Sequence, residues 1–201
     1  MHPMQRIGLL GGSFNPVTIG HLLIAQAAVE ELALDRLVFI PAAQSPFKPD
    51  FDLAPAPLRL RMLRLALAGQ PKFGLDDQEI QRGGVSYTVD TLRLYRQNHP
   101  AARLYYLVGA DHAAKLPQWR EPAVLADLAE FVICARPGEA PPQVPPPFRG
   151  HLLGNVPVGF SASLVRARIA AGLAPDGLVP PAVAEVLRET ELYKPQNKLN
   201  Q

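Results

Sequence analysis

The sequence predicts an α/β fold: a doubly wound, Rossmann-like parallel sheet with helices on both faces and a small helical segment at the C-terminal end. Short apolar runs typical of strands alternate along the chain with longer runs typical of helices. The first apolar run ends in two glycines, Gly11 and Gly12, immediately before a helix-like run, as in many α/β folds that bind ligands. Hydrophobic residues make up 48% of the 201 residues, which is ample for a packed core.

The first part of the chain is expected to alternate between strands and helices. Apolar positions interrupted by polar ones indicate the first helix. Pro41 stops the second strand, and Gly69 is a natural cap for the second helix. In order, we expect a strand at Arg6–Leu10, a helix at Ile19–Leu32, a strand at Arg36–Ile40, an irregular proline-rich segment at 41–56 and a helix at Leu58–Ala68.

The alternation continues through the second part. Residues 137–147 hold six prolines and are expected to form an extended loop. A proline pair at 180–181 suits the first turn of a last helix. In order, we expect strand-like pieces at 73–75 and 78–81, a helix at Tyr87–Asn98, a strand at Leu104–Val108, helices at 111–116 and 121–128, a strand at Phe131–Ala135, a strand near 152–158, and helices at 163–171 and from 180 to Glu189.

Length and composition limit the possible classes of protein. We expect one domain over residues 1–201, whose C-terminal helical part covers about 160–195. The formal net charge of +2 argues against nucleic acid as a partner. No apolar run reaches the roughly 18 residues of a membrane span, and the N-terminus lacks the apolar core of a signal peptide, so we expect a cytoplasmic protein that does not bind membranes. The oligomeric state is not predicted.

Cys134 is the only cysteine of the chain. A single cysteine excludes an internal disulfide and any metal site built from several thiolates. Its position in Phe-Val-Ile-Cys-Ala indicates a buried structural thiol.

The loops that follow Leu10, Ile40 and Val108 are expected to lie in one crevice. Ligands of such sheets bind outside the carboxyl ends of the strands, where the strand order reverses. The first of these loops contains Gly-Gly-Ser-Phe-Asn-Pro-Val-Thr-Ile-Gly-His, residues 11–21. It is not a P-loop, since no lysine follows the glycines. It is not the dinucleotide fingerprint either, since the glycine spacing differs and no acid follows the second strand.

We therefore interpret Gly11–Gly12 as a turn that lets the backbone approach a ligand closely. Thr18 and His21 lie three residues apart, so their side chains face the same way in a first helical turn. The unpaired N–H groups of a helix start favour an anion, and a histidine there can donate to phosphate oxygens. A histidine that only caps the helix at the surface is the alternative.

Residues 11–21 resemble the G-G-x-F-x-P-x-[HT]-x-G-H signature of the nucleotidylyltransferase superfamily. A second motif of that superfamily resembles Phe160-Ser161-Ala162-Ser163-Leu164-Val165-Arg166. Over nearly the whole chain the sequence is similar to the bacterial nicotinate-nucleotide adenylyltransferases. Their landmarks recur as Ile40-Pro41, Pro46-Phe47-Lys48-Pro49, Ser86-Tyr87-Thr88-Val89-Asp90-Thr91-Leu92, Gly109-Ala110-Asp111, Leu116-Pro117-Gln118-Trp119 and Arg136-Pro137-Gly138.

The resemblance implies the nucleotidylyltransferase fold and the transfer of AMP from ATP to nicotinate mononucleotide, with deamido-NAD and pyrophosphate as products of NAD biosynthesis. It implies ATP and nicotinate mononucleotide as substrates, and Mg²⁺ held mostly by the nucleotide and water rather than by a metal site of the protein. The attacking phosphate is already an anion, so positioning and charge neutralisation can supply catalysis.

The resemblance also assigns residues to roles. His21, Thr18 and Arg166 would be catalytic, His21 at the α-phosphate and Arg166 at the β- and γ-phosphates. Ser161 and Ser163 precede a helix, so one could cap it while both help to hold phosphate. The ATP site would comprise Gly11, Gly12, Ser13, Phe14, His21, Gly109, Asp111, Ser161, Ser163 and Arg166, and the nicotinate mononucleotide site Lys48, Tyr87, Thr88, Trp119 and Arg136.

Two positions depart from the family pattern, and both lie on the acceptor side. Phe47 stands where the family often has histidine, and Arg120 stands where an aromatic residue often follows the tryptophan. Two other functions stay open: phosphopantetheine adenylyltransferase, which has the same first motif, and a nucleotide-binding module without turnover. The 41–56 loop could be a lid or a static spacer.

Overall fold

The fold is built on a six-stranded sheet in which every strand is parallel to its neighbours, in the order β3-β2-β1-β4-β5-β6. We examined it in a computed structural model that describes residues 4–47, 53–134, 144–154 and 161–195. The order reverses between β1 and β4, as in doubly wound folds. The strands are β1 (Arg6–Gly12), β2 (Arg36–Pro41), β3 (Phe73–Leu75), β4 (Arg103–Gly109), β5 (Glu130–Cys134) and β6 (Gly150–Leu153).

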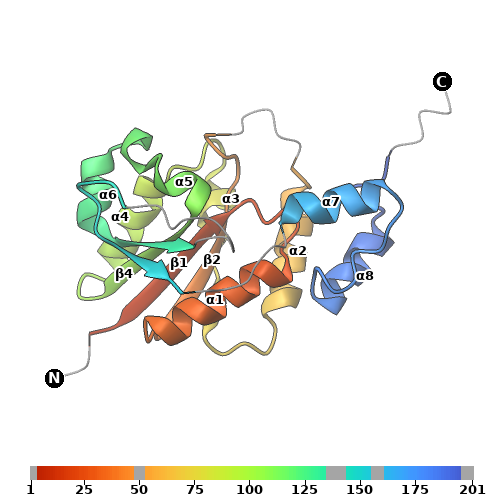
Figure 1. The fold of residues 1–201 in the computed structure, drawn as a ribbon, viewed down its shortest axis with the longest axis horizontal. Helices are drawn as coiled ribbons and strands as arrows, with labels where there is room; N and C mark the ends of the chain where they lie inside the picture. The colour runs from red at the N-terminus through yellow and green to blue at the C-terminus, as the bar shows by residue number, and fades with distance from the viewer. Residues whose placement is uncertain (1–3, 48–52, 135–143, 155–160, 196–201) are drawn as a thin grey trace.

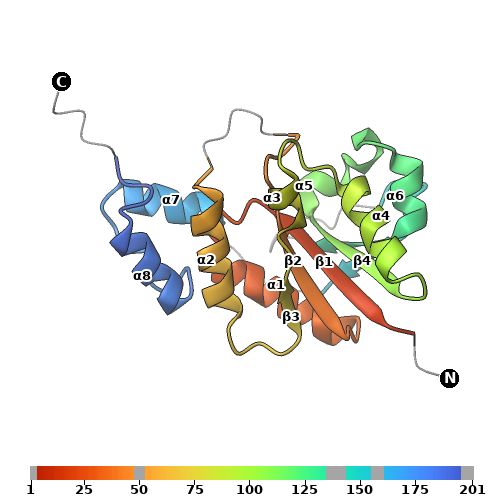
Figure 2. The same cartoon turned by 180° about the vertical axis from the view of Figure 1, so that it is seen from behind.

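Helices cover both faces of this sheet (Figures 1 and 2). Residues of α1 (Ile19–Glu31), α2 (Ala56–Leu67), α7 (Ala162–Ala170) and α8 (Pro181–Glu189) share one buried cluster with one face of the sheet. Residues of α4 (Thr88–Asn98), α5 (Ala110–Ala113) and α6 (Pro122–Leu128) share a second cluster with the other face.

The strands supply both clusters because successive side chains point to opposite faces. In β1, Ile7 and Leu9 belong to the cluster with α4, while Leu10 belongs to the cluster with α1. In β4, Tyr106 belongs to the cluster with α4, and Tyr105 belongs to the cluster with α1. Burial on both sides accounts for the nearly continuous apolar runs of these strands.

The C-terminal helices lie at one end of the molecule, next to α2 and far from the N-terminal end of the chain (Figure 1). A salt bridge of 2.9 Å between Arg61 of α2 and Glu189 of α8 bridges the two helices at the surface. Because α7 carries the second predicted motif, this packing determines where that motif lies relative to β1.

The predicted alternation of strands and helices is confirmed, with four corrections to its elements. Residues 78–81 are helical, not extended: α3 (Gln78–Arg82) follows the short strand β3. The carboxylate of Asp76 accepts the backbone N–H of Gln78 at 3.0 Å, and Gly83 and Gly84 end the helix with φ of +69° and +65°. These local polar contacts and glycines outweigh the single strand-like Ile80.

The second correction concerns Gly11 and Gly12, which are the last residues of β1 rather than a turn. They pair with Ile40 and Pro41 of β2, and the carbonyl of Gly12 accepts the N–H of Ala42 at 2.9 Å. Third, the helix expected at 111–116 is shorter, since α5 is followed by the 3₁₀ turn η1 (Leu116–Gln118). Fourth, β6 begins at Gly150, and residues 155–158 of the expected strand lie outside the described residues.

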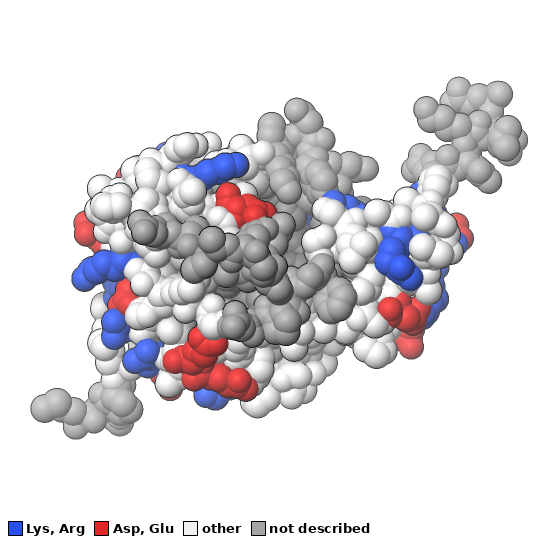
Figure 3. All heavy atoms as spheres, in the orientation of Figure 1, with Lys and Arg blue, Asp and Glu red and all other residues white. Residues whose placement is uncertain are grey.

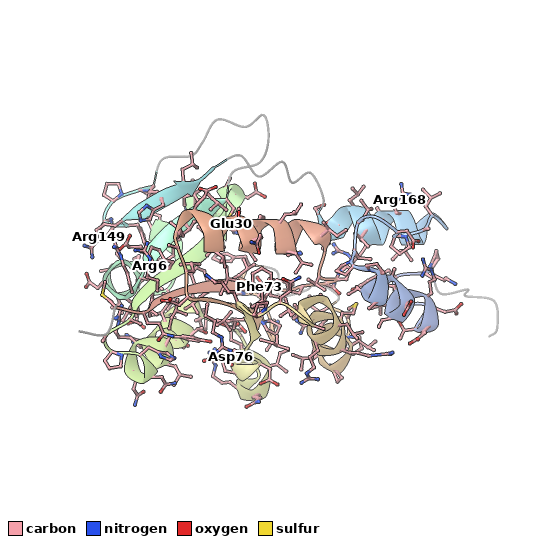
Figure 4. All side chains as sticks on the ribbon, turned by 90° about the horizontal axis from the view of Figure 1, so that it is seen from below. Arg6, Glu30, Phe73, Asp76, Arg149 and Arg168 are labelled. Atoms are coloured by element: carbon pink, nitrogen blue, oxygen red, sulfur yellow. The ribbon has the colours of Figure 1, made fainter. Side chains whose placement is uncertain are left out.

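Contacts around β3 and the charge on the surface complete the description of the fold. Figure 4 labels Phe73 and Asp76 near β3: Phe73 packs against the cluster that includes α1, and Asp76 accepts the hydroxyl of Tyr95 from α4 at 2.7 Å. On the face drawn in Figure 3, Lys and Arg are interspersed with Asp and Glu among the described residues. No helix in the described ranges is both long and apolar enough to cross a membrane.

Candidate active site

A cavity of about 500 Å³ opens at the carboxyl ends of the central strands. Its walls come from the ends of β1 and β4 and from the loops that follow β1, β2 and β4. The cavity therefore lies where the strand order reverses, and the crevice predicted from the loops after Leu10, Ile40 and Val108 is confirmed.

The start of α1 fixes the orientation of His21. Thr18 is the N-cap of α1, and Thr18 and His21 form a capping box. The backbone N–H of Thr18 donates to Nδ1 of His21 at 3.0 Å, and Oγ1 of Thr18 lies 2.8 Å from the same nitrogen. Because Nδ1 accepts from an amide, the neutral ring carries its proton on Nε2. Nε2 has no hydrogen-bond partner within the described ranges.

His21 lines the cavity as a neutral group. Burial lowers its pKa from 6.5 to about 4. The buried ring of Phe14 lies edge-on to the imidazole, with the two centroids 5.1 Å apart. Phe14, predicted for the ATP site, therefore has its side chain in the core beneath His21. The ring therefore caps the helix through one nitrogen and lines the cavity with its remainder.

Gly11 brings β1 close to Tyr106 of β4. A Cβ built on Gly11 would lie 2.2 Å from the hydroxyl oxygen of Tyr106, so no other residue fits there without displacing the tyrosine. Gly11, Gly12 and Ser13, which were predicted for an ATP site, all line the cavity. The two glycines thus line the cavity from a strand end, not from a turn.

Arg166 of α7 contacts the first loop although 151 residues separate it from Asn15. Its Nη1 donates to the carbonyl of Asn15 at 2.7 Å, and its Nη2 donates to Oγ of Ser163 at 3.0 Å. Burial lowers the pKa of Arg166. The two sequence motifs therefore meet in the fold, although Arg166 and Ser163 do not themselves line the cavity.

Ser161 caps α7 and lines the cavity. Its Oγ accepts the N–H of Leu164 at 3.2 Å, which confirms the expected capping of this helix. Gly109 and Asp111, also predicted for an ATP site, line the wall at the junction of β4 and α5.

Aromatic side chains form the other half of the cavity and an adjoining space of about 90 Å³. Trp119, Phe47 and Thr88 line both spaces, and Tyr87 lines the smaller one. The rings of Phe47 and Trp119 have centroids 5.9 Å apart. The indole N–H of Trp119 is buried without a hydrogen-bond partner among the described residues.

Arg120 lies at the edge of the smaller space, with its guanidinium carbon 4.6 Å from the centre of the Tyr87 ring. Lys48 and Arg136, which were predicted to contact the acceptor, lie outside the described residues. Cys134 is buried as predicted, and burial raises its pKa to about 12, which makes it a poor nucleophile.

The sequence interpretation missed Glu79 and Tyr106, which both line the cavity. The sequence pattern predicts a strand around Glu79, and it predicts Tyr106 only as a core residue of a buried strand. A signal for Tyr106 was present, since a tyrosine in a buried strand needs a partner for its hydroxyl. No local signal identified Glu79.

Over the residues that the structure describes, no group of three or more His, Cys, Asp or Glu side chains could hold a metal ion.

Comparisons with known proteins identify the family of this chain. Residues 9–168 match the family model described as cytidylyltransferase-like. The chain is 39% identical over 195 residues to a probable nicotinate-nucleotide adenylyltransferase of Opitutus terrae, covering 95% of this chain and 99% of the relative. It is 38% identical over 195 residues to one of Shouchella clausii, covering 97% and 100%.

Solved structures share the fold. The Plasmodium falciparum nicotinic acid mononucleotide adenylyltransferase complexed with NaAD matches with a TM-score of 0.78 at 20% identity, over 94% of this chain and 97% of that one. The same enzyme complexed with APC gives a TM-score of 0.78 at 19% identity. The motifs, the strand order and these matches together lead to one conclusion: this chain belongs to the cytidylyltransferase-like family and, within it, to the nicotinate-nucleotide adenylyltransferases.

Proposed function

We propose that this protein transfers the adenylyl group of ATP to nicotinate mononucleotide, releasing pyrophosphate and forming deamido-NAD. The relatives at 38–39% identity over nearly their whole length support this reaction. The proposed chemistry depends on the capped His21. Its Nδ1 accepts a hydrogen bond from the backbone N–H of Thr18, so the proton of the neutral ring is on Nε2.

In this reaction a phosphate oxygen of the mononucleotide attacks the α-phosphorus of ATP, the new P–O bond forms, and pyrophosphate leaves with the electrons of the bond that breaks. The attacking oxygen is already ionised, so no protein base is required. His21 donates its Nε2–H to an α-phosphate oxygen and stabilises the charge that grows there in the transition state. Thr18 holds the ring for this donation before substrate arrives.

The remaining phosphates lie between the first loop and α7. Ser161 caps α7 and Ser163 lies in its first turn, where N–H groups of the helix start favour an anion, and Arg166 binds the β- and γ-phosphates with its planar guanidinium. Gly11, Gly12 and Ser13 let the nucleotide approach β1, and Gly109 with Asp111 holds the adenosine. Mg²⁺ bound to ATP would supply charge neutralisation at the phosphate oxygens.

The acceptor occupies the aromatic half. Trp119 stacks on the pyridine ring, and the backbone N–H groups at Tyr87 and Thr88, which begin α4, bind its carboxylate. Lys48 and Arg136 contact the phosphate of the mononucleotide. The whole chain acts as one domain in this proposal.

The test is pyrophosphate release with ATP, Mg²⁺ and one acceptor at a time. We expect turnover with nicotinate mononucleotide, a much lower kcat/KM with nicotinamide mononucleotide, and none with phosphopantetheine. Turnover only with phosphopantetheine would replace this function with its alternative, and tight ATP binding without any pyrophosphate would indicate a binding module.

A further inference from the structure

Glu79 is a buried carboxylate in the wall of the cavity, and neither the family motifs nor the mechanism above uses it. Its side chain is only 5% exposed, yet it lines the main cavity. Within the described residues it has no Lys or Arg partner. A buried carboxylate without a cation costs free energy unless hydrogen-bond donors surround it.

One such donor belongs to the protein. The hydroxyl of Thr91 donates to Oε1 of Glu79 at 2.5 Å. Thr91 is fully buried in α4 and holds the carboxylate in place from behind. Oε2 receives no hydrogen bond from any described residue. The carboxylate is therefore fixed at one oxygen and still able to accept hydrogen bonds at the other.

The neighbours of Glu79 place it in the acceptor half. Thr91 lies one turn along α4 from Thr88, which lines both the main cavity and the smaller space. Oγ1 of Thr88 donates to the hydroxyl of Tyr106 at 3.3 Å. Burial, together with the nearby charge of Glu79, raises the pKa of Tyr106, so its phenol stays protonated. Trp119 lies edge-on to the same tyrosine, with the centroids 6.2 Å apart.

The chemistry of the acceptor identifies what a carboxylate could bind there. Nicotinate mononucleotide has an anionic carboxylate at one end and an anionic phosphate at the other, and Glu79 would repel both. Its pyridinium nitrogen is cationic but has no proton to donate. Only the ribose between them offers hydroxyl donors. Hydrogen bonds from hydroxyls to a fixed carboxylate are strong, and they discriminate sharply against analogues that lack the hydroxyl.

We propose that Glu79, held by Thr91, binds the ribose hydroxyls of the mononucleotide acceptor and so selects a ribonucleotide. This inference rests on the proposed function, because it assumes that the acceptor is nicotinate mononucleotide. Glu79 contacts the substrate but takes no proton from it, since the attacking group is the phosphate at the other side of the ribose.

The experiment combines variants of the protein with variants of the substrate. Pyrophosphate release is measured with nicotinate mononucleotide and with its 2′-deoxy and 3′-deoxy analogues, for the wild type and for Glu79→Gln. We expect the wild type to lose about 10- to 100-fold in kcat/KM with at least one deoxy analogue, as for a hydrogen bond to a charged group. Glu79→Gln should lose a similar factor with the natural acceptor and little more when the hydroxyl is also removed. KM for ATP should stay unchanged.

Controls separate binding from a structural role. Glu30→Gln changes an exposed carboxylate of α1, labelled in Figure 4, and should behave as the wild type. Thr91→Val should give a smaller loss of the same kind, confined to KM for the acceptor. Additive effects of Glu79→Gln and the deoxy analogues would overturn the proposal.

Other outcomes are equally clear. If Glu79→Gln does not fold, the wild type with the two analogues still decides, because equal kcat/KM for all three acceptors contradicts hydroxyl recognition. If the wild type does not use nicotinate mononucleotide at all, the proposed function fails and this inference fails with it. If it uses the acceptor and ignores the hydroxyls, only this inference fails.

Discussion

The two halves of the cavity are built in different ways. The half proposed for the phosphates consists of the loop after β1 with the start of α1, and of the start of α7. In its first part, Thr18 and His21 orient each other through hydrogen bonds within a single turn. The aromatic half, which is proposed to hold the acceptor, is assembled from distant segments, because Phe47, Glu79, Thr88 and Trp119 come from four different parts of the chain. Local backbone geometry positions the first half, and core packing positions the second.

This difference separates the expected effects of substitutions. A group that donates to the α-phosphate acts on charge that grows in the transition state, so its loss lowers kcat. A ring or carboxylate that holds the acceptor acts equally in the ground state, so its loss raises KM. Changes in the two halves should therefore appear in different kinetic constants.

The largest effect is expected for His21→Ala. Removal of the donor should lower kcat by about 1,000-fold, the range measured when a single oxyanion donor is lost. KM for the acceptor should change little. Steady-state kinetics of pyrophosphate release measure both constants.

His21→Gln is the matched control for this variant. Glutamine at the third position of a helix completes a capping box with Thr18, so the thermal midpoint should stay near that of the wild type. Its kcat should still fall by at least about 100-fold, because the donor no longer lies where Nε2 was. Near-normal turnover in either folded variant would remove His21 from the chemistry.

The next largest effect is expected for Arg59, a buried residue of α2 that contacts loops near the cavity. Arg59 is 2% exposed and donates to the carbonyls of Ala54, Ser13 and Ala42 at 3.0, 2.9 and 2.9 Å, so one side chain connects three loop positions. Arg59→Met should lower the free energy of unfolding by about 4 kcal/mol, since it leaves buried carbonyls unsatisfied. Urea unfolding measures this loss, and a change below about 1 kcal/mol would show that the loops are held by other contacts.

The same contrast explains what the sequence could predict. The parallel, doubly wound sheet and the position of the crevice followed from alternating patterns and from parallel-sheet topology. The loop with His21 was recognisable because its residues lie together in the chain. Even there, the glycine pair was taken for a turn. Whether Gly11 and Gly12 pair with β2 depends on the register of a distant strand, which no local pattern contains.

The acceptor half was less predictable for the same reason. Glu79 has its role only because α3 packs where α4 brings Thr91 to it, and the short stretch around Ile80 reads equally as strand or helix. Arg59 was an ordinary helix residue in the sequence. Its burial results from three loops that converge on it, so only the folded chain distinguishes it from the exposed Arg61 on the same helix.

Stability should also depend on pH through the phosphate half. The folded pKa of His21, about 4, lies below its unfolded value near 6.5, so the folded state binds fewer protons between these values. Its contribution is fully present above about pH 6.5 and is lost as the pH falls toward 4. Between pH 7.5 and 5.0 the loss should be about 2 kcal/mol. Urea unfolding of the wild type and of His21→Gln at these two pH values measures the contribution of His21 to stability. Equal losses of unfolding free energy in the two proteins would contradict the prediction.

A moderate effect is expected in the acceptor half for Trp119→Leu. Loss of the stacking ring should raise KM for nicotinate mononucleotide about tenfold, as for other aromatic stacking on bases, and leave KM for ATP unchanged. Trp119→Phe, which keeps a ring, should recover most of this. Because the indole also lies edge-on to Phe131 with centroids 6.4 Å apart, the thermal midpoint of each variant must be recorded. A tenfold fall in kcat at constant KM would mean that the two halves do not act separately.

The smallest effect is expected for Arg120→Ala at the edge of the acceptor half. The Arg120 side chain is 52% exposed, and its Nε lies 3.9 Å from Glu121, which pairs more closely with Arg93. Its charge therefore remains largely available to the small space that it lines with Tyr87, and water screens it. Removal should lower kcat/KM about threefold for nicotinate mononucleotide and leave nicotinamide mononucleotide unchanged, because only the first acceptor has a carboxylate on its ring.

The salt concentration and the variant Arg120→Lys test whether charge causes the effect of Arg120. The threefold difference should shrink as the salt concentration rises to about 1 M, where the Debye length is about 3 Å. Arg120→Lys keeps the charge but loses the planar group above Tyr87, so it should retain the preference for nicotinate if charge is the cause and lose it if stacking is. An equal fall for both acceptors would mean that Arg120 only holds Tyr87 in place, and selection between them would then depend on the start of α4.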